Sequence, residues 1–186
     1  MPDFVINSDG YIEGIIHHNS PYFNLRPHNE ISLLVIHNIS LPPRVFGENF
    51  VDDLFMGRLD PDAHPYFRGI YQLEVSAHCF IRRTGEIIQY VPFLKRAWHA
   101  GKSEFQGRCA CNDFSVGIEL EGADDIPYTS HQYDTLASIT RSLMQSYPDI
   151  TDNRITGHSN IAPDRKTDPG EAFDWERFRI MLKNPG

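Results

Sequence analysis

The sequence lacks any apolar run long enough to cross a membrane. A membrane-spanning helix needs roughly 18 to 20 consecutive apolar residues, and no window of the 186 residues approaches that length. Residues 1–10 also lack the basic start and the apolar core of a secretory signal. These absences argue against an integral membrane protein, and they lead us to expect a protein of the cytoplasm.

Cysteine and positive charge are both in short supply. The three cysteines, Cys79, Cys109 and Cys111, are an odd count, which predicts free thiols in a reducing compartment. Cys109 and Cys111 could bind a metal, but their spacing is short for a zinc knuckle and the chain has no second pair. The formal net charge of −8 argues against nucleic acid and anionic membranes as partners.

The composition is that of a folded globule. Hydrophobic residues make up 40% of the chain and aromatic residues 12%, so a chain of this length can bury a normal core. No internal repeat, low-complexity tract or linker interrupts it. We therefore expect a single domain over residues 1–186, with a core of about residues 20–180.

Two parts of the chain predict strands by their apolar patterning. Residues 33–36 are a continuous apolar run that ends at His37, which is typical of a central strand covered on both faces. Residues 75–82 and 86–91 flank a turn at residues 83–85, and this arrangement predicts a hairpin.

A further strand is predicted at residues 114–121 by a regular alternation of side chains. The apolar residues of this segment point to one face: Val116, Ile118 and Leu120. The other face carries small and acidic residues: Ser115, Gly117, Glu119 and Glu121. Carboxylates beside a glycine suit the floor of a functional site.

A period of 3.6 residues predicts three helices, at residues 49–58, at residues 130–147 and from residue 174 onward. Thr129 and Gln132 form a capping box for the second helix, and Asp174 is a good N-cap for the third. Residues 92–113 are mostly irregular, and a loop of that length is usually functional. The elements together predict an α/β or α+β layer fold, with a mixed β-sheet flanked by helices.

Residues 157–170 concentrate chemically active side chains. They place His158, Lys166 and Asp168 in a loop that we expect to be too rich in turn formers for a helix. Imidazole and carboxylate are zinc ligands, and an ammonium group could hold an oxyanion. Taken singly, His158 could be a surface residue and Asp168 could shape a turn, while His37 could be a core histidine bonded to the backbone.

Five separated motifs, in the same order, resemble those of a known family. The motifs are residues 34–43, 75–78, 96–101, 112–122 and 157–170. They are similar to the zinc-dependent N-acetylmuramoyl-L-alanine amidases of the peptidoglycan-recognition fold, over roughly residues 20–178. Within that family the resemblance is strongest to cytoplasmic enzymes that act on 1,6-anhydro-muropeptides.

The resemblance implies one Zn2+ ion and assigns roles to five residues. It matches the zinc ligands to His37, His158 and Asp168, the catalytic glutamate to Glu119, and the lysine that stabilises the transition state to Lys166. Two neutral imidazoles and one carboxylate leave zinc a fourth position, as a catalytic site requires.

The strand period leaves one alternative open for the catalytic base. Glu121 lies on the same predicted strand face as Glu119, and either carboxylate could take a proton from water. Only the family match favours Glu119.

Five residues are candidates for contacts to the substrate: Asn38, Trp98, His99, Arg108 and Asn112. An aromatic ring beside an imidazole suits a cleft that binds a sugar and a peptide, and the Arg fork suits carboxylates. Some relatives carry arginine where this chain has Glu74 and Ala110, so contacts to the stem peptide would involve other cations here, Arg108 or Arg165.

The resemblance and the missing export signal together imply the substrate. We expect zinc-dependent hydrolysis of the amide bond between 1,6-anhydro-N-acetylmuramic acid and L-alanine in imported muropeptides. Such a reaction serves peptidoglycan recycling and affects β-lactamase induction indirectly where that circuit exists. We expect a monomer. The alternatives are a muropeptide sensor without catalysis, a zinc peptidase and a structural zinc site, and the complete set of five residues favours the amidase.

Overall fold

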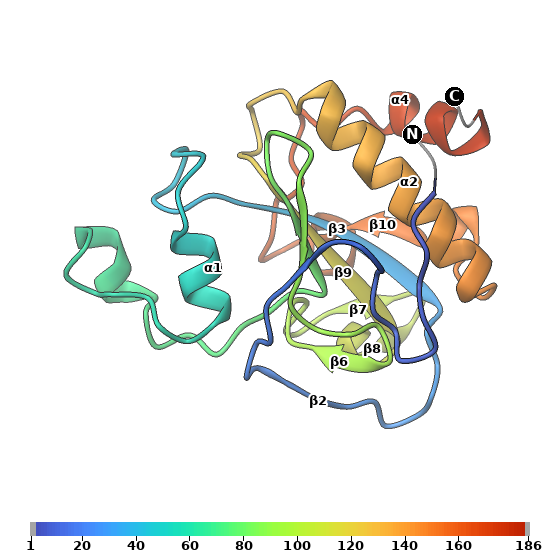
Figure 1. The fold of residues 1–186 in the computed structure, drawn as a ribbon, viewed down its shortest axis with the longest axis horizontal. Coiled ribbons are helices and arrows are strands. Elements are labelled where there is room, and N and C mark those ends of the chain that lie inside the picture. The colour runs from blue at the N-terminus through green and yellow to red at the C-terminus, as the bar shows by residue number, and fades with distance from the viewer. Residues whose placement is uncertain (1–2, 185–186) are drawn as a thin grey trace.

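A mixed six-stranded sheet forms the centre of the computed structural model, which describes residues 3–184 (Figure 1). The strands lie in the order β1, β5, β4, β9, β3, β10. Their bounds are Ile16–His17 (β1), Leu33–Ile39 (β3), Cys79–Ile81 (β4), Ile87–Gln89 (β5), Ser115–Glu121 (β9) and Ile155–Gly157 (β10). Neighbours among β4, β9, β3 and β10 pair in parallel, whereas β5 pairs antiparallel with β4. The predicted mixed sheet and hairpin are therefore confirmed.

Strands β3 and β9 each run for seven residues and pair in parallel along their whole length. The predicted apolar strand at residues 33–36 continues through His37 to Ile39. Ile36 lies opposite Ile118, and His37 lies opposite Glu119. Because successive side chains point to opposite faces of a sheet, these two pairs lie on different faces.

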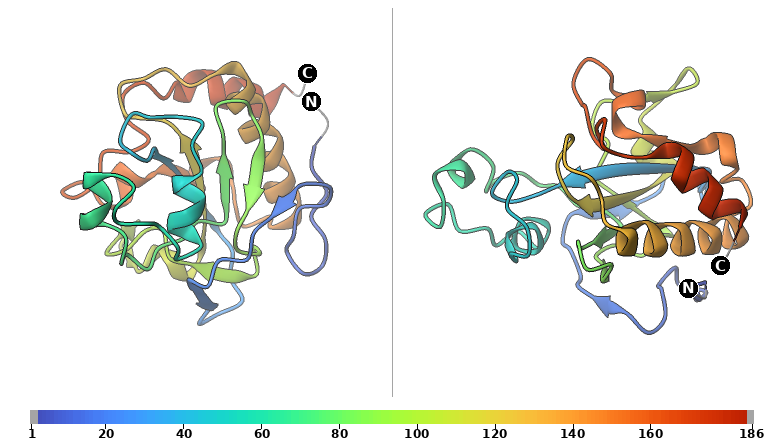
Figure 2. Two further views of the ribbon diagram at one scale, coloured as in Figure 1. Left: turned by 60° about the vertical axis from the view of Figure 1, so that its left-hand side comes forward. Right: turned by 90° about the horizontal axis from the view of Figure 1, so that it is seen from above.

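Helices α2 (Ser130–Ser146) and α4 (Trp175–Lys183) cover one face of the sheet, as Figures 1 and 2 show. Leu34 and Ile36 of β3 and the apolar residues of β9 pack there in one cluster with Leu136 and Phe178, which are fully buried. The capping box of Thr129 and Gln132 is present, and the side chain of Asp174 caps α4. Both helix starts predicted from the sequence are confirmed.

The other face of the sheet is covered by two separate apolar clusters. The first joins Phe80 of β4 to helix α1 (Phe50–Phe55) and the 3-10 helix η1 (Pro65–Gly69). The second joins Leu33 and Val35 of β3 to Ala100, Cys111, Phe114 and Ile161. Figures 1 and 2 show the segment with α1 and η1 projecting from the body of the sheet.

The first part of the predicted strand 75–82 is not paired as a strand. Only Cys79–Ile81 joins the sheet as β4. The Ser76 amide donates to the Trp98 carbonyl at 3.1 Å. The His78 amide still donates to the Gly117 carbonyl of β9 at 3.0 Å, but the Gly117 amide donates to the His78 ring, at 3.0 Å, and not to a backbone carbonyl. Because the His78 ring takes this amide, the regular pairing of β4 with β9 begins only at Cys79.

The prediction that residues 157–170 form no helix is wrong at one point. Directly after β10, residues His158–Ile161 form a single helical turn, α3. These four residues contain neither glycine nor proline, and Pro163 follows two residues later. The turn formers of the segment therefore act after α3 and not within it.

The predicted long loop at residues 92–113 contains short elements of its own. Strand β6 (Lys95–Ala97) pairs with β2 (Phe23–Leu25), and β7 (Glu104–Phe105) pairs with β8 (Arg108–Cys109). Two 3-10 turns complete the element order: η2 (Cys111–Asp113) and η3 (Asp152–Arg154).

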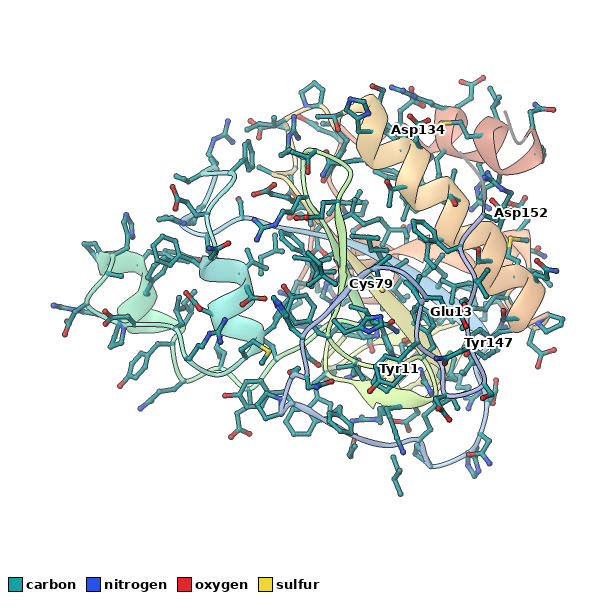
Figure 3. All side chains as sticks on the ribbon, in the orientation of Figure 1. Tyr11, Glu13, Cys79, Asp134, Tyr147 and Asp152 are labelled. Atoms are coloured by element: carbon teal, nitrogen blue, oxygen red, sulfur yellow. The ribbon has the colours of Figure 1, made fainter. Side chains whose placement is uncertain are left out.

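The three cysteines are free, as predicted, and Cys79 lies in the middle of the molecule (Figure 3). Among the helices of residues 3–184, none has both the length and the apolar character needed to span a bilayer.

Candidate metal centre and active site

Three side chains from distant parts of the chain converge on one point. His37 Nδ1 lies 3.0 Å from His158 Nδ1 and 3.1 Å from Asp168 Oδ2, and His158 Nδ1 lies 3.0 Å from the same oxygen. Both imidazoles are almost fully buried. Three electron-pair donors at the corners of a nearly equilateral triangle form a candidate metal site.

The parallel strands explain why these residues meet. The carboxyl ends of β3, β9 and β10 lie at the same edge of the sheet, where α/β proteins commonly bind ligands. His37 lies near the end of β3, and His158 follows the last residue of β10 directly. Asp168 returns to this edge because its carbonyl accepts a hydrogen bond from the Ser159 amide at 2.9 Å.

Burial and charge set the protonation states that a metal requires. Burial lowers the pKa of His37 to about 4, although Asp168 opposes this shift, so the ring is neutral at neutral pH. Burial would raise the pKa of Asp168, but hydrogen bonds with His158 and His37 lower it below its usual range. A neutral imidazole and an ionised carboxylate are the forms that bind zinc.

The donor triangle fits a zinc ion. Zinc binds nitrogen and oxygen donors at about 2.0 to 2.2 Å, so tetrahedral neighbours lie roughly 3.3 to 3.6 Å apart. The observed separations of 3.0 to 3.1 Å are within a few tenths of an ångström of that range. Three protein ligands leave a fourth position open, as in catalytic zinc sites.

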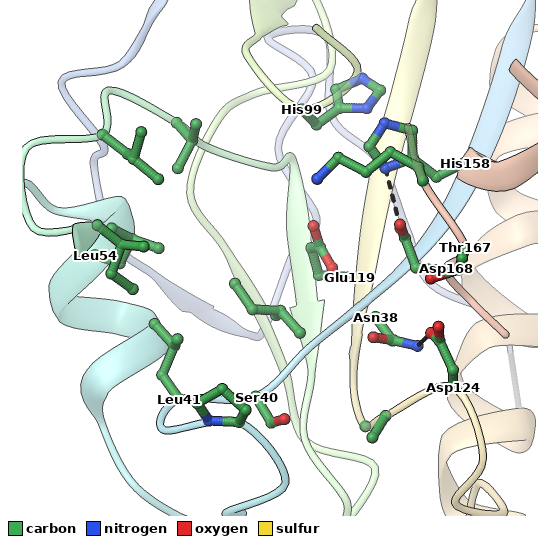
Figure 4. A pocket seen from close by; sticks show the side chains of 18 of the residues that line it. Asn38, Ser40, Leu41, Leu54, His99, Glu119, Asp124, His158, Thr167 and Asp168 are labelled. Carbon is green, nitrogen blue, oxygen red and sulfur yellow. Dashed lines mark hydrogen bonds and ion pairs between the residues drawn. The ribbon is translucent and has the colours of Figure 1, made fainter. Parts of the chain in front are cut away.

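Glu119 stands beside the triangle with an unused oxygen. Its Oε1 lies 3.9 Å from His37 Nδ1, and within residues 3–184 its buried Oε2 has no hydrogen-bond partner. Burial raises the pKa of Glu119 well above 4.5, the charge of Asp168 adds to this shift, and Lys166 opposes it. Figure 4 shows the Glu119 carboxylate near Asp168 at the cavity. A carboxylate with a raised pKa and a free oxygen suits a proton acceptor.

Glu121, the alternative base, has a different environment. Its Oε1 accepts a hydrogen bond from the Gly47 amide at 2.5 Å, and its Oε2 accepts one from the Arg83 amide at 2.8 Å. Glu121 lines a different cavity, away from the donor triangle. The geometry therefore separates the two carboxylates that the strand period left equivalent.

A cavity of about 630 Å³ is lined by two residues of the donor triangle, His158 and Asp168. Its polar end includes His158, Asp168, Glu119 and Lys166. The opposite side is formed by apolar residues of the projecting segment, residues 41–73: Leu41, Leu54, Phe55, Tyr66, Ile70 and Leu73. Figure 4 shows Leu41 and Leu54 across the cavity from Asp168. The cavity can thus hold a ligand that has both polar and apolar parts.

Three of the five predicted substrate contacts line this cavity: Asn38, Trp98 and His99. Asn38 donates to Asp124 Oδ1 at 2.8 Å (Figure 4) and to the Pro169 carbonyl at 3.1 Å. The ring of Trp98 stacks on Tyr22, and its Nε1 donates to Asn24. Both side chains therefore have fixed positions at the cavity wall.

His99 lies against a candidate metal ligand. Its Nδ1 lies 2.9 Å from His37 Nε2, and its Nε2 lies 3.0 Å from Ser115 Oγ. Burial lowers the pKa of His99 well below 6.5, and the neighbouring His37 lowers it further. Both ring nitrogens of His99 therefore already have partners within the protein.

The structure places the other two predicted contacts outside the cavity. Arg108 binds the Glu30 carboxylate through its Nη1 at 2.7 and 2.8 Å and lies over the Phe114 ring, at a different cavity. Asn112 is buried, and its Oδ1 accepts hydrogen bonds from the His99 and Ala100 amides at 3.2 and 2.8 Å. Neither residue lines the cavity beside the donor triangle, so the structure does not support these two predicted contacts.

The apolar side of the cavity was not anticipated from the sequence. The η1 segment, with Tyr66, Ile70 and Leu73, has no motif that separates cavity residues from ordinary loop residues. The only signal was the apolar side of the predicted helix at 49–58, whose Leu54 and Phe55 also serve the local core. Asp124, which holds Asn38, likewise lies in a stretch without a predicted role.

Comparison with known proteins identifies the family of this chain. The family model for N-acetylmuramoyl-L-alanine amidase matches residues 27–171. A relative from Escherichia coli (strain K12), described as 1,6-anhydro-N-acetylmuramyl-L-alanine amidase AmpD, is 60% identical over 174 residues, 93% of this chain and 94% of the relative. A relative of the same description from Salmonella typhimurium (strain SL1344) is 65% identical over 164 residues, 88% of this chain and 87% of the relative.

Solved structures give the same result for the fold. A crystal structure of a selenomethionine AmpD derivative superposes with a TM-score of 0.93 at 57% identity, covering 96% of this chain and 99% of that chain. The Escherichia coli amidase AmiD, in complex with the substrate anhydro-N-acetylmuramic acid-L-Ala-D-γ-Glu-L-Lys, superposes with a TM-score of 0.61 at 25% identity, covering 95% of this chain and 65% of that chain. The predicted fold class is confirmed.

Proposed function

The chain belongs to the N-acetylmuramoyl-L-alanine amidase family, and from this premise we propose that it hydrolyses the amide bond between 1,6-anhydro-N-acetylmuramic acid and L-alanine with one zinc ion as cofactor. The observation that carries the proposal is the donor triangle of His37, His158 and Asp168 beside Glu119, whose buried Oε2 has no hydrogen-bond partner in the part of the chain that the structure describes. The names of the 1,6-anhydro amidase relatives support this choice of substrate.

The metal has a defined part in this proposal. His37, His158 and Asp168 would hold it, since their three donor atoms face one another. Zinc bound there would supply a Lewis acid that polarises the scissile carbonyl and makes water more acidic. The remaining chemistry belongs to side chains of this chain.

Glu119 would take the proton from the attacking water and later give it to the departing amine of L-alanine. Its raised pKa suits both steps, because a carboxylate with a pKa nearer neutrality is a stronger base and still a usable acid. Lys166 lines the same cavity and acts electrostatically on Glu119. Its ammonium would stabilise the negative charge that develops on the carbonyl oxygen.

The cavity supports a substrate with a sugar and a peptide. Trp98 offers an aromatic face at the wall, and the apolar residues of the projecting segment lie opposite the polar end. The structurally similar amidase AmiD binds an anhydro-muramyl peptide as its substrate. We infer that this chain acts as a monomer in the cytoplasm, on fragments released by turnover of the cell wall.

A muropeptide sensor without catalysis is the second candidate. It would bind the same fragments but would not need a buried carboxylate with a free oxygen beside the metal ligands, because leaving such an oxygen unpaired costs stability. A structural zinc site would carry four protein ligands, whereas the cluster found among residues 3–184 has three.

One assay separates these functions. Purified protein is incubated with 1,6-anhydro-N-acetylmuramyl-tripeptide, and release of the free anhydro sugar is followed by mass spectrometry. We expect cleavage that stops with a chelator and returns with stoichiometric zinc. Cleavage that a chelator leaves untouched would contradict the metal mechanism, and binding without cleavage would favour the sensor. The same tripeptide on a reducing muramic acid measures the preference for the anhydro sugar.

A further inference from the structure

We propose that the dipeptide His99-Ala100 holds both histidine ligands in the orientation that binds the metal, and that His99 is a positioning residue for His37. The inference rests on the proposed zinc site. It concerns the ring nitrogens that face away from the metal, and it gives Gly117 and Asn112 supporting roles.

His37 is oriented by a chain of side-chain hydrogen bonds. When its Nδ1 lone pair faces the donor triangle, the ring proton is on Nε2, which donates to His99 Nδ1 at 2.9 Å. His99 then carries its own proton on Nε2 and donates it to Ser115 Oγ at 3.0 Å. The two rings meet nearly edge to face, with an interplanar angle of 86°. This chain of bonds selects the tautomer of His37 that leaves Nδ1 free.

His158 is oriented by the backbone of the adjacent residue. Its Nε2 lies 3.3 Å from the Ala100 carbonyl oxygen, which accepts the ring proton and leaves Nδ1 free for the metal. The same carbonyl accepts a hydrogen bond from Arg165 Nη2 at 2.6 Å. Consecutive residues therefore set the tautomers of two ligands that are 121 positions apart.

The Asn112 side chain fixes the backbone of the dipeptide. The Asn112 side-chain oxygen accepts the amide protons of both His99 and Ala100. Asn112 is buried, so this contact is shielded from competing water. These contacts suit a residue that positions the dipeptide, and they do not suit one that binds a ligand in the cavity.

Gly117 makes room for the His99 ring against strand β9. A methyl group added to Gly117 would lie 2.4 Å from His99 Cγ and 2.5 Å from His99 Nδ1. Such contacts are too close for any arrangement in which the ring keeps its place. The glycine that the sequence places on the polar face of β9 therefore leaves space for the His99 ring, which a larger residue would push away from His37.

Outer partners of this kind matter because an imidazole can present either nitrogen. A ring without a partner on its far nitrogen loses its preference for one tautomer and one rotation. Loss of such a partner typically lowers metal affinity by about 10- to 100-fold. Here the partner is a neutral imidazole and not the more common carboxylate, so its contribution is orientation without added charge.

The test measures zinc affinity by competition with a chromophoric chelator in four proteins: wild type, Gly117→Ala, His99→Ala and the double variant. We expect each single variant to bind zinc about 10- to 100-fold more weakly. The double variant should match His99→Ala alone, since the added methyl group meets no ring there. A rescue variant, His99→Asn, places an amide oxygen near the former Nδ1 and should recover part of the affinity.

Gly69→Ala is the matched control, because a methyl group there meets no atom of residues 3–184 within 4 Å, and it should keep wild-type affinity. Thermal unfolding of every variant reports any general loss of fold. Wild-type affinity in folded Gly117→Ala and His99→Ala, or additive losses in the double variant, would overturn the inference while leaving the zinc site intact. A wild-type protein that binds no zinc would instead overturn the proposed function.

Discussion

Glu119 and Glu121 lie two residues apart on β9, yet within the described residues 3–184 one has a buried oxygen without a hydrogen-bond partner and the other has both oxygens bound by backbone amides. Replacing Glu119 by alanine should reduce kcat by about 10²- to 10⁴-fold, the usual contribution of a general base. Zinc affinity should stay near wild type, and folding stability should equal or exceed that of wild type, because the variant removes a buried oxygen that costs stability. Turnover of the anhydro-muramyl tripeptide and zinc titration measure the two effects.

Glu121→Ala is the matched comparison for that variant. It removes the acceptors of the Gly47 and Arg83 amides, and a buried group left without its partner costs about 1 to 3 kcal/mol. We expect a lower free energy of unfolding in urea with kcat largely preserved. The reverse pattern, an inactive Glu121 variant and an active Glu119 variant, would show that the base is misassigned.

Metal removal should destabilise the fold as well as stop the reaction. A ligand that binds only the folded chain stabilises it by about 4 kcal/mol at 1,000 times its Kd. A chelator should therefore lower Tm, and one equivalent of zinc should restore it. In Asp168→Ala, which lacks one corner of the triangle, zinc should shift Tm much less. Equal shifts in both proteins would place the stabilising ion elsewhere.

Lys166→Ala tests the proposed oxyanion partner. Losing one such group typically lowers kcat by about 10²- to 10³-fold, and KM and zinc affinity should change little because the ligands are intact. Lys102→Ala is the control, since Lys102 is exposed and lines a neighbouring cavity. A rise in KM with an unchanged kcat would assign Lys166 to substrate binding.

His78 predicts a loss of stability in mild acid. Burial lowers its pKa from 6.5 to about 3, and the nearby Arg26 contributes. Its folded pKa is below its unfolded pKa, so below pH 6.5 the unfolded chain binds a proton that the folded chain excludes. The contribution of His78 to the free energy of unfolding is therefore fully present above pH 6.5 and is lost as the pH falls towards about 3.

The size of this effect is measurable between pH 7.5 and 5.5. One proton taken up only by the unfolded chain costs about 1.4 kcal/mol per pH unit, so His78 should account for a loss of roughly 1.4 kcal/mol over that interval. Urea unfolding of wild type and His78→Gln at both pH values isolates it, because the remaining histidines are common to both. Identical losses in the two proteins would exclude His78 as the source.

The sequence predicted the elements whose signals are local. The apolar run before His37, the alternation of residues 114–121 and the caps at Thr129 and Asp174 all follow from neighbours within a few positions. The three proposed zinc ligands came from family motifs, and the structure brings them together.

The features of the site that the sequence did not predict depend on contacts between distant segments. Asn112 was predicted to contact substrate, but its oxygen faces backbone amides of a loop that only the fold places above it. Arg108 was predicted to bind a carboxylate, and it does so with Glu30 of this chain, 78 residues earlier. Strand period alone left Glu119 and Glu121 equal, because the groups that distinguish them come from other loops.

The register between β3 and β9 affects the specific activity that is expected of a folded preparation. The pairing that sets His37 opposite Glu119 also sets Ile36 opposite Ile118 beneath α2. A slip of one residue would turn one strand over relative to the other, so apolar residues of that strand would face the cavity and its reactive residue the core. A molecule with a slipped register would lose its native core as well as its active site. A folded but inactive form is therefore not expected. Specific activity per folded molecule should therefore stay constant between preparations, whatever their refolding yield.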